Sequence, residues 1–169
     1  SGFPAAIKSA KESDLVILAL GENWGMSGEA RSRGDIHIPG VQEELACEIY
    51  KVNKKCITLL MGGRPLIFNQ IAEKAPAILY TWFLGTEAGN AMVDVITGKY
   101  NPSARVPMSF PKHIGQIPVY YNYKNTGRPA VDKEGNYSSR YIDIDNKPQY
   151  PFGYGLSYTT FEYGQPDIS

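Results

Sequence analysis

The chain of 169 residues carries 17 basic and 17 acidic side chains, so its formal net charge at pH 7 is zero. This length suits a single domain with a sizeable core. The balanced charge argues against nucleic acid or an anionic membrane surface as a partner, and no apolar run approaches the ~20 residues that a membrane span needs. The two cysteines, Cys47 and Cys56, form no disulfide framework, and we expect free thiols.

The first half of the chain alternates predicted strands with predicted helices. Short apolar runs predict buried strands at residues 15–20, 56–61 and 77–82. Helices are expected at residues 41–53, near 69–74 and at 86–97. Strands separated by helices imply a parallel sheet with right-handed crossovers, which predicts an α/β fold.

For two of these helices the sequence pattern predicts which residues face the core. Helix 41–53 places Val41, Leu45, Ile49 and Val52 on one stripe, which predicts its inward face. For helix 86–97 we expect Thr86 to be the N-cap and Gly98 to end the helix. Its expected inward residues are Ala88, Ala91, Met92, Val95 and Ile96.

The second half is rich in Pro, Gly, Asn and Tyr and has a different character. Residues 105–110 form an edge strand at best, because Pro107 cannot donate to a ladder. Residues 115–150 show no helical period. A stretch this long without regular structure predicts a binding loop or a wrap around another domain.

The segment Gly21–Asp35 is a long loop that leaves the C-terminal end of the first predicted strand. In open α/β sheets ligands bind at that edge. The loop offers three acids, Glu22, Glu29 and Asp35. It contains no dinucleotide fingerprint, and the chain has no phosphate-binding loop and no nucleophile elbow. His37 and His113 lie far apart, so we expect no metal site.

The three carboxylates are the stronger indication of chemistry. Cleavage of a glycosidic bond usually needs two carboxyl groups, one to protonate the leaving oxygen and one to attack or to activate water. A glutamate near apolar and aromatic neighbours can act as the acid. The alternative is that all three acids are solvated loop residues, since most Asp and Glu side chains are exposed.

An ordered set of segments resembles the second domain of glycoside hydrolase family 3, with bacterial periplasmic beta-glucosidases the most similar. The loop contributes Gly-Glu at the strand end and then Glu29-Ala30-Arg31-Ser32-Arg33-Gly34-Asp35. Later segments that carry the resemblance are 38–42, 63–66, 81–91, 98–103, 106–111, 116–121, 125–129 and 150–159. Ala104 departs from the family pattern, which usually has glycine in that turn.

The resemblance implies a three-layer α/β sandwich with a flavodoxin-like, mostly parallel sheet, helices on both faces and a long irregular C-terminal wrap. It also implies a retaining beta-glucosidase that acts on terminal beta-D-glucosyl residues, with no cofactor. In the family the nucleophilic aspartate lies on an N-terminal (β/α)8 barrel, which this chain is too short to contain. Glu29 matches the acid/base position, and Glu22 is the alternative, with a structural role as its other interpretation.

Four further side chains are candidates for substrate binding. Trp24 and Met26 are expected to line the aglycone side of the pocket, with ordinary packing as the alternative. Arg31 and Arg33 are expected to pair with Glu29 or to bridge to the barrel, unless they are simply solvated. The expected partners are a beta-linked glycoside or oligosaccharide, the barrel and a C-terminal fibronectin-like domain, without nucleic acid or membrane.

The resemblance also sets expectations about the whole protein. Residues 1–165 form the sandwich domain, truncated at its N-terminal edge, and residues 166–169 begin a linker to the fibronectin-like domain. The protein is expected in the periplasm or secreted, and the isolated fragment is expected to be inactive. A noncatalytic carbohydrate-binding or scaffold domain and a flavodoxin-like cofactor domain remain as alternative functions.

Overall fold

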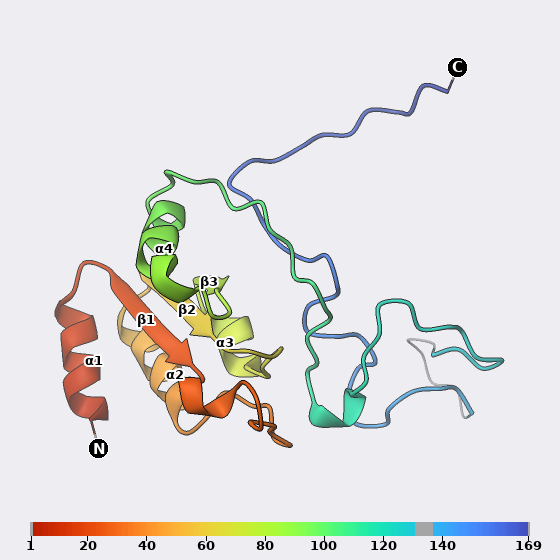
Figure 1. The fold of residues 1–169 in the computed structure, drawn as a ribbon, viewed down its shortest axis with the longest axis horizontal. Helices are drawn as coiled ribbons and strands as arrows, with labels where there is room; N and C mark the ends of the chain where they lie inside the picture. The colour runs from red at the N-terminus through yellow and green to blue at the C-terminus, as the bar shows by residue number, and fades with distance from the viewer. Residues whose placement is uncertain (1, 131–136, 169) are drawn as a thin grey trace.

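The computed structural model describes residues 2–130 and 137–168 and shows a parallel sheet with helices on both faces (Figure 1). The strands are β1 (Val16–Gly21), β2 (Cys56–Met61) and β3 (Ala77–Tyr80), in the order β1-β2-β3. Both strand pairs are parallel, with Leu18 opposite Thr58 and Leu60 opposite Tyr80. The predicted three-layer α/β sandwich is therefore confirmed.

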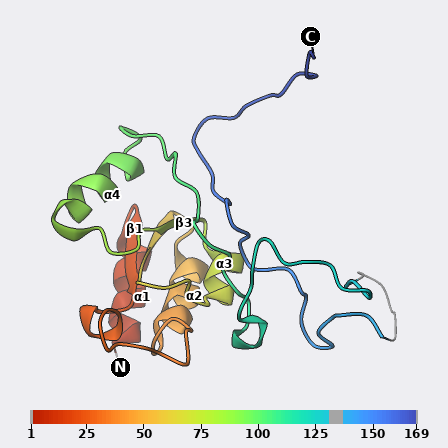
Figure 2. The same ribbon diagram turned by 45° about the vertical axis from the view of Figure 1, so that its right-hand side comes forward.

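Helices α2 (Gln42–Val52) and α3 (Asn69–Lys74) cover one face of this sheet. Leu18, Leu20 and Leu60 project from that face into the main core, where Leu60 is fully buried. Helix α4 (Ala88–Ile96) lies on the other side of the sheet (Figures 1 and 2). Its cover is incomplete, because Ile17 on that face of β1 remains 51% exposed.

Helix α1 (Phe3–Glu12) precedes β1 and was not among the predicted elements. Pro4 lies in its first turn, where a missing N–H costs no hydrogen bond, and alanines favour the helix that follows. The amide of Asn53 donates to the carbonyl oxygens of Ala10 and Ser13, which ties the end of α1 to the end of α2. A Pro-Ala start was the available signal for this helix.

The expected inward faces of two helices need correction. In α2 the buried residues are Ala46, Cys47, Ile49 and Tyr50, whereas Val41 is 55% exposed and lies before the first helical residue. In α4 no residue is fully buried, Ala91 is exposed, and Thr86 lies in the preceding 3-10 turn Gly85–Glu87 without capping the helix. Gly98 follows the end of α4 with φ +76°, as expected for a stop.

The chain beyond α4 is the predicted irregular C-terminal wrap (Figure 1). Among its described residues, a 3-10 turn at Ile114–Gln116 is the only helical element. No strand forms at 105–110; Phe110 makes one isolated antiparallel bridge with Tyr150 instead. Phe110 is 1% exposed and packs edge-on against Tyr80 and Trp82, so this bridge anchors the wrap to the sheet.

No helix in the described part of the chain is long and apolar enough to cross a membrane. Cys47 and Cys56 are both buried free thiols, as expected.

Candidate active site

The loop that follows β1 crosses the C-terminal edge of the sheet before the chain enters α2. Gly21 has φ +129°, and a Cβ there would lie 1.8 Å from the carbonyl oxygen of Met61, so the strand end requires glycine. The amide of Gln42 closes the base of the loop. Its oxygen accepts from Gly21 N at 2.7 Å, and its nitrogen donates to the carbonyl oxygens of Gly21 and Pro39.

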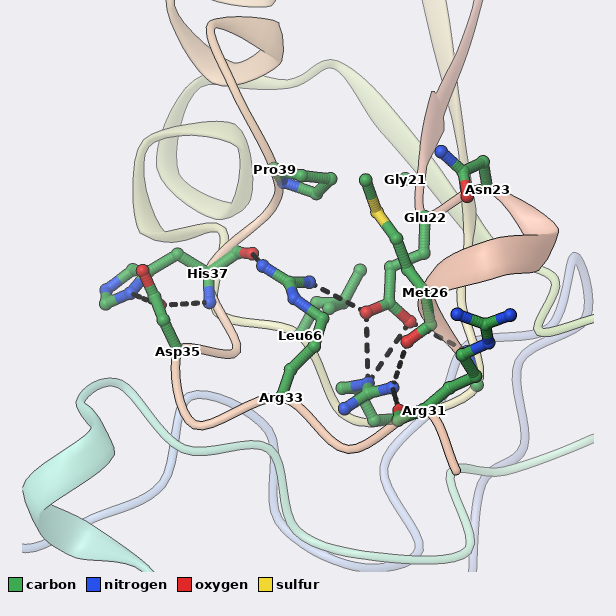
Figure 3. A network of polar contacts seen from close by, with 12 residues as sticks. Gly21, Glu22, Asn23, Met26, Arg31, Arg33, Asp35, His37, Pro39 and Leu66 are labelled. Carbon is green, nitrogen blue, oxygen red and sulfur yellow. Dashed lines mark hydrogen bonds and ion pairs between the residues drawn. The ribbon is translucent and has the colours of Figure 1, made fainter. Parts of the chain in front are cut away.

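Glu22, the first acid of the loop, is a buried ionic anchor (Figure 3). Its side chain is 0% exposed, and Arg33 Nη1 donates to Glu22 Oε1 at 2.7 Å. Arg64 Nε lies 3.0 Å from Oε1 and 3.2 Å from Oε2, and Gly63 N donates to Oε2 at 3.3 Å. Burial of a carboxylate is costly unless it is paired and hydrogen-bonded in this way. Glu22 is therefore fully engaged within the protein.

Arg64 joins the anchor to the middle of the loop. Its Nη2 donates to the carbonyl oxygens of Met26 at 2.5 Å and Arg31 at 3.1 Å. These two carbonyls flank residues 27–30, so one guanidinium holds both ends of that turn. The Arg64 carbonyl in turn accepts a hydrogen bond of 2.5 Å from Tyr80 Oη.

Glu29 lies on this turn and is exposed. The turn uses left-handed backbone at Gly28 (φ +126°) and Ala30 (φ +56°), and Arg31 N donates to Gly28 O at 3.2 Å. Within residues 2–130 and 137–168, no hydrogen bond or ion pair reaches the Glu29 carboxylate. Its position is consequently set by the backbone of the turn, and its carboxylate is free to meet another molecule or domain.

Asp35, the third acid, is engaged locally with His37 (Figure 3). One carboxylate oxygen accepts from His37 N at 2.9 Å and lies 2.6 Å from His37 Nδ1. The backbone hydrogen bond, followed by the side-chain contact with His37, lowers the pKa of Asp35. A carboxyl group with a lowered pKa is a poor proton donor near neutral pH.

The four candidate substrate-binding residues have different environments in the structure. Arg33 pairs with Glu22 and also donates to His37 O at 3.2 Å, which corrects the expectation that it pairs with Glu29. Arg31 has an exposed side chain, and its carbonyl serves the Arg64 contact. Met26 is half-buried, and its carbonyl oxygen accepts the hydrogen bond from Arg64.

Trp24 is 85% exposed in the 3-10 turn Trp24–Met26, so the alternative of core packing does not apply to it.

A largely apolar hollow of about 450 Å³ opens beside the loop. Trp24 and Ser27 line it from the loop. Met61 lines it from the end of β2, Trp82 from the segment that follows β3, and Met92 from α4. The hollow and the Glu29 turn therefore lie at the same carboxyl edge of the sheet, where ligands of α/β proteins bind.

Sequence reasoning missed the part that the segment after β2 plays in this site. Gly63 and Arg64 appeared only within the family-like segment 63–66, whereas they support the loop directly. A Cβ on Gly63 would lie 1.9 Å from Ser27 Oγ, so this glycine allows the loop to approach closely. The available signal was the run Gly62-Gly63-Arg64-Pro65 at the end of a neighbouring parallel strand.

Comparison with known proteins defines the family of this domain. The model of the glycosyl hydrolase family 3 C-terminal domain matches residues 1–158. The chain belongs to glycosyl hydrolase family 3. Among relatives of this family 3 domain, a periplasmic beta-glucosidase of Salmonella typhimurium is 50% identical over 165 residues, covering 97% of this chain and 22% of the relative. A beta-xylosidase of Formosa agariphila is 46% identical over 167 residues, covering 99% of this chain and 22% of the relative.

Solved structures of beta-glucosidases are also similar to this family 3 domain. The crystal structure of a beta-glucosidase from Listeria innocua in complex with gluconolactone has a TM-score of 0.90 and 45% identity. The match covers 95% of this chain and 22% of that one. A beta-glucosidase from Kluyveromyces marxianus in complex with glucose is more distant, with a TM-score of 0.75 and 27% identity. The chain thus spans about a fifth of the length of these glycoside hydrolases.

Proposed function

We propose that this domain supplies the general acid/base carboxyl group, Glu29, to a retaining beta-glycosidase of the beta-glucosidase type. One observation carries the proposal: of the three loop acids, only Glu29 has no polar partner among the described residues. Glu22 is enclosed by two arginines, and Asp35 is held ionised by His37. Glu29 is therefore the loop acid that remains available to exchange a proton with a bound substrate.

The chemistry needs a second carboxylate from elsewhere. In a retaining mechanism one carboxylate attacks the anomeric carbon while the acid protonates the leaving oxygen; the same acid then removes a proton from the water that releases the sugar. Glu29 takes the proton-transfer role in both steps. The nucleophilic aspartate is expected on an N-terminal (β/α)8 barrel, whose strand-helix units require ~250 residues.

The names of the relatives support a beta-linked substrate. They include a periplasmic beta-glucosidase and a beta-xylosidase, two activities that differ in the sugar accepted. We favour terminal non-reducing beta-D-glucosyl residues, with Trp24 contacting the aglycone from the edge of the hollow. For Arg33 and Met26 we favour a role in holding the loop over contact with substrate, and Arg31 remains a candidate for contact with the substrate or the barrel. The name of the Salmonella relative, a periplasmic beta-glucosidase, supports a periplasmic or secreted location.

Replacement of Glu29 by glutamine in the full-length enzyme tests the proposal. Without the acid, turnover of phenyl beta-glucoside is expected to fall by about 10²- to 10⁴-fold, whereas dinitrophenyl beta-glucoside, whose leaving group needs no proton, should still form the glycosyl-enzyme. Azide, which needs no general base, should restore turnover of the dinitrophenyl substrate and yield beta-glucosyl azide.

Glu73→Gln on α3 is the matched control, because Glu73 is also exposed. Equal rates for Glu29→Gln and Glu73→Gln would exclude the acid/base role and favour a noncatalytic carbohydrate-binding or scaffold domain.

We also propose a domain assignment for the chain. Residues 1–165 are assigned to the sandwich domain, and residues 166–169 to a linker toward a fibronectin-like domain. The isolated chain should not hydrolyse glycosides, since it supplies only one of the two carboxyl groups. Measurable hydrolysis of an aryl beta-glucoside by the purified fragment would contradict the assignment of the nucleophile to the barrel.

A further inference from the structure

The position of Glu29 depends on contacts made by other residues. Its carboxylate has no polar partner among the described residues, so no side-chain contact aims it. The turn that carries it has positive φ at Gly28, where glycine allows it, and at Ala30 (φ +56°). For a non-glycine residue such as Ala30 this left-handed backbone is unfavourable. Something outside the turn has to hold its two ends.

Arg64 makes the contacts that hold those ends. The carbonyl oxygens of Met26 and Arg31 flank residues 27–30, and both accept from Arg64 Nη2. The same guanidinium is fixed on its other side by the Glu22 carboxylate, at 3.0 Å from Nε. Arg64 thus connects the turn to the buried anchor at the strand end, and its side chain is only 17% exposed.

The backbone of Arg64 is held by contacts of its own. The Arg64 carbonyl accepts from Tyr80 Oη, and Tyr80 stacks on Phe68 and packs edge-on against Phe110. The neighbouring Gly63 N donates to Glu22. The turn therefore rests on a side chain whose backbone is joined to the aromatic core.

We propose that Arg64 is a positioning residue for Glu29, which it aligns through the carbonyls of Met26 and Arg31 without touching substrate. This inference rests on the proposed acid/base role of Glu29. An arginine is required, because its separate Nε and Nη2 groups reach the carboxylate and the two carbonyls together. The single ammonium of a lysine cannot span both sites.

The decisive experiment compares Arg64→Lys with Glu29→Gln in the full-length enzyme, using phenyl and dinitrophenyl beta-glucosides. A displacement of a catalytic group by about 1 Å costs on the order of 10²-fold in rate. Arg64→Lys is therefore expected to lower kcat/KM on the phenyl substrate about 10²-fold and kcat/KM on the dinitrophenyl substrate much less, because only the phenyl leaving group needs the proton. Azide should accelerate turnover of the dinitrophenyl substrate by Arg64→Lys, as it does for Glu29→Gln.

Arg105→Lys is the matched control for a purely structural arginine. Arg105 also donates to loop carbonyls, those of Ser103 and Ala104, and to Ser157, but it lies after α4. Its loss should lower the two substrates' rates by the same factor, if at all. The same uniform loss in Arg64→Lys, or no loss, would overturn the positioning role.

The outcomes separate the two proposals. If Glu29→Gln shows no dependence on the leaving group, the acid/base assignment fails; if Glu29→Gln shows it and Arg64→Lys does not, only the positioning role fails. Should Arg64→Lys yield no folded enzyme, Glu22→Gln replaces it, because it keeps Arg64 but removes its charged anchor. Glu22→Gln must then show the same dependence on the leaving group, and a uniform loss would overturn the inference.

Discussion

Two glutamates of one loop illustrate how the same residue type takes opposite roles. Glu22 is covered completely and bound by Arg33, Arg64 and Gly63, whereas Glu29 is exposed and unpaired among the described residues. Buried charges are costly unless they are fully paired, while an exposed one costs little. Glu22 therefore serves stability, and Glu29 is free to serve chemistry.

This contrast predicts that the same substitution changes the stability of the folded domain by a large amount at Glu22 and by a small amount at Glu29. Glu22→Gln should lower the free energy of unfolding by about 3 kcal/mol, because two guanidinium groups lose their buried counter-charge. Glu29→Gln should change it by less than about 0.5 kcal/mol. Urea unfolding of both variants checks the prediction, and a similar small effect in both would show that Glu22 is not an anchor.

Tyr50 should make the domain less stable at high pH. Its hydroxyl lies 2.5 Å from Thr58 Oγ1 in the core, and burial raises the pKa of Tyr50 from 10.0 to about 12. The folded state thus favours the protonated phenol, so this contribution to stability is complete below pH 10 and is lost as the pH rises toward about 12. Tyr50→Phe should flatten the decline in unfolding free energy within that window; an unchanged decline would assign it to other groups.

At the scale of the elements, the loop after β1 depends on the segment after β2. The two strands are parallel neighbours, so their carboxyl ends lie side by side and their following loops meet. The two loops approach each other closely at Gly63 and Ser27, where there is no room for a Cβ on Gly63. Because a parallel sheet brings these loops together, the support of the Glu29 turn comes from residues far from it in the sequence.

Gly63→Ala should therefore disturb the loop by overpacking. The new Cβ would lie 1.9 Å from Ser27 Oγ and 2.9 Å from Ser27 Cβ, and overpacking of this kind costs about 1–3 kcal/mol. The double variant Gly63→Ala with Ser27→Gly removes the colliding atoms and should recover part of the loss. Unfolding measurements on both single variants and on the pair give the coupling, and strict additivity would contradict the contact.

At the scale of the whole molecule, the C-terminal wrap is held to the sheet by aromatic packing. Phe110 contacts Phe68, Tyr80, Trp82 and Tyr150 and pairs with Tyr150 in an isolated bridge. Much of the chain beyond α4 extends away from the sheet (Figure 2). Many tyrosines of the wrap remain exposed, including Tyr120, Tyr121 and Tyr163. One buried ring thus carries much of the attachment.

Phe110→Ala should loosen the wrap and destabilise the domain. Truncation of a buried phenylalanine costs about 3–5 kcal/mol, whereas Phe161→Ala, at a site that is 73% exposed, should cost less than about 0.5 kcal/mol. Unfolding free energies and the rate of proteolysis within residues 101–158 measure both effects. Equal protease resistance of the two variants would show that Phe110 does not anchor the wrap.

The sequence by itself determined the α/β class, the three strands and the loop that carries the acids. Apolar runs such as 56–61 need only local pattern to be recognised, and the ordered motifs indicated the family and Glu29. Helix α1 was not predicted, because its apolar pattern is short and only one of its residues, Ala10, is buried. The stripe of α2 was misplaced because residues at its ends, Val41 and Val52, lie at the edge of the contact with the sheet.

Only the tertiary structure decided which acid is engaged and what holds the loop. Glu22, Glu29 and Asp35 are chemically similar in the sequence, and their environments differ through partners such as Arg64 that folding alone brings near. The parallel register of β1 and β2 places Arg64, which follows β2, beside Glu22, which follows β1. From there Arg64 donates hydrogen bonds to the carbonyl oxygens of Met26 and Arg31. Local pattern specifies elements, whereas the contacts that give a carboxylate its role form between strand ends distant in the chain.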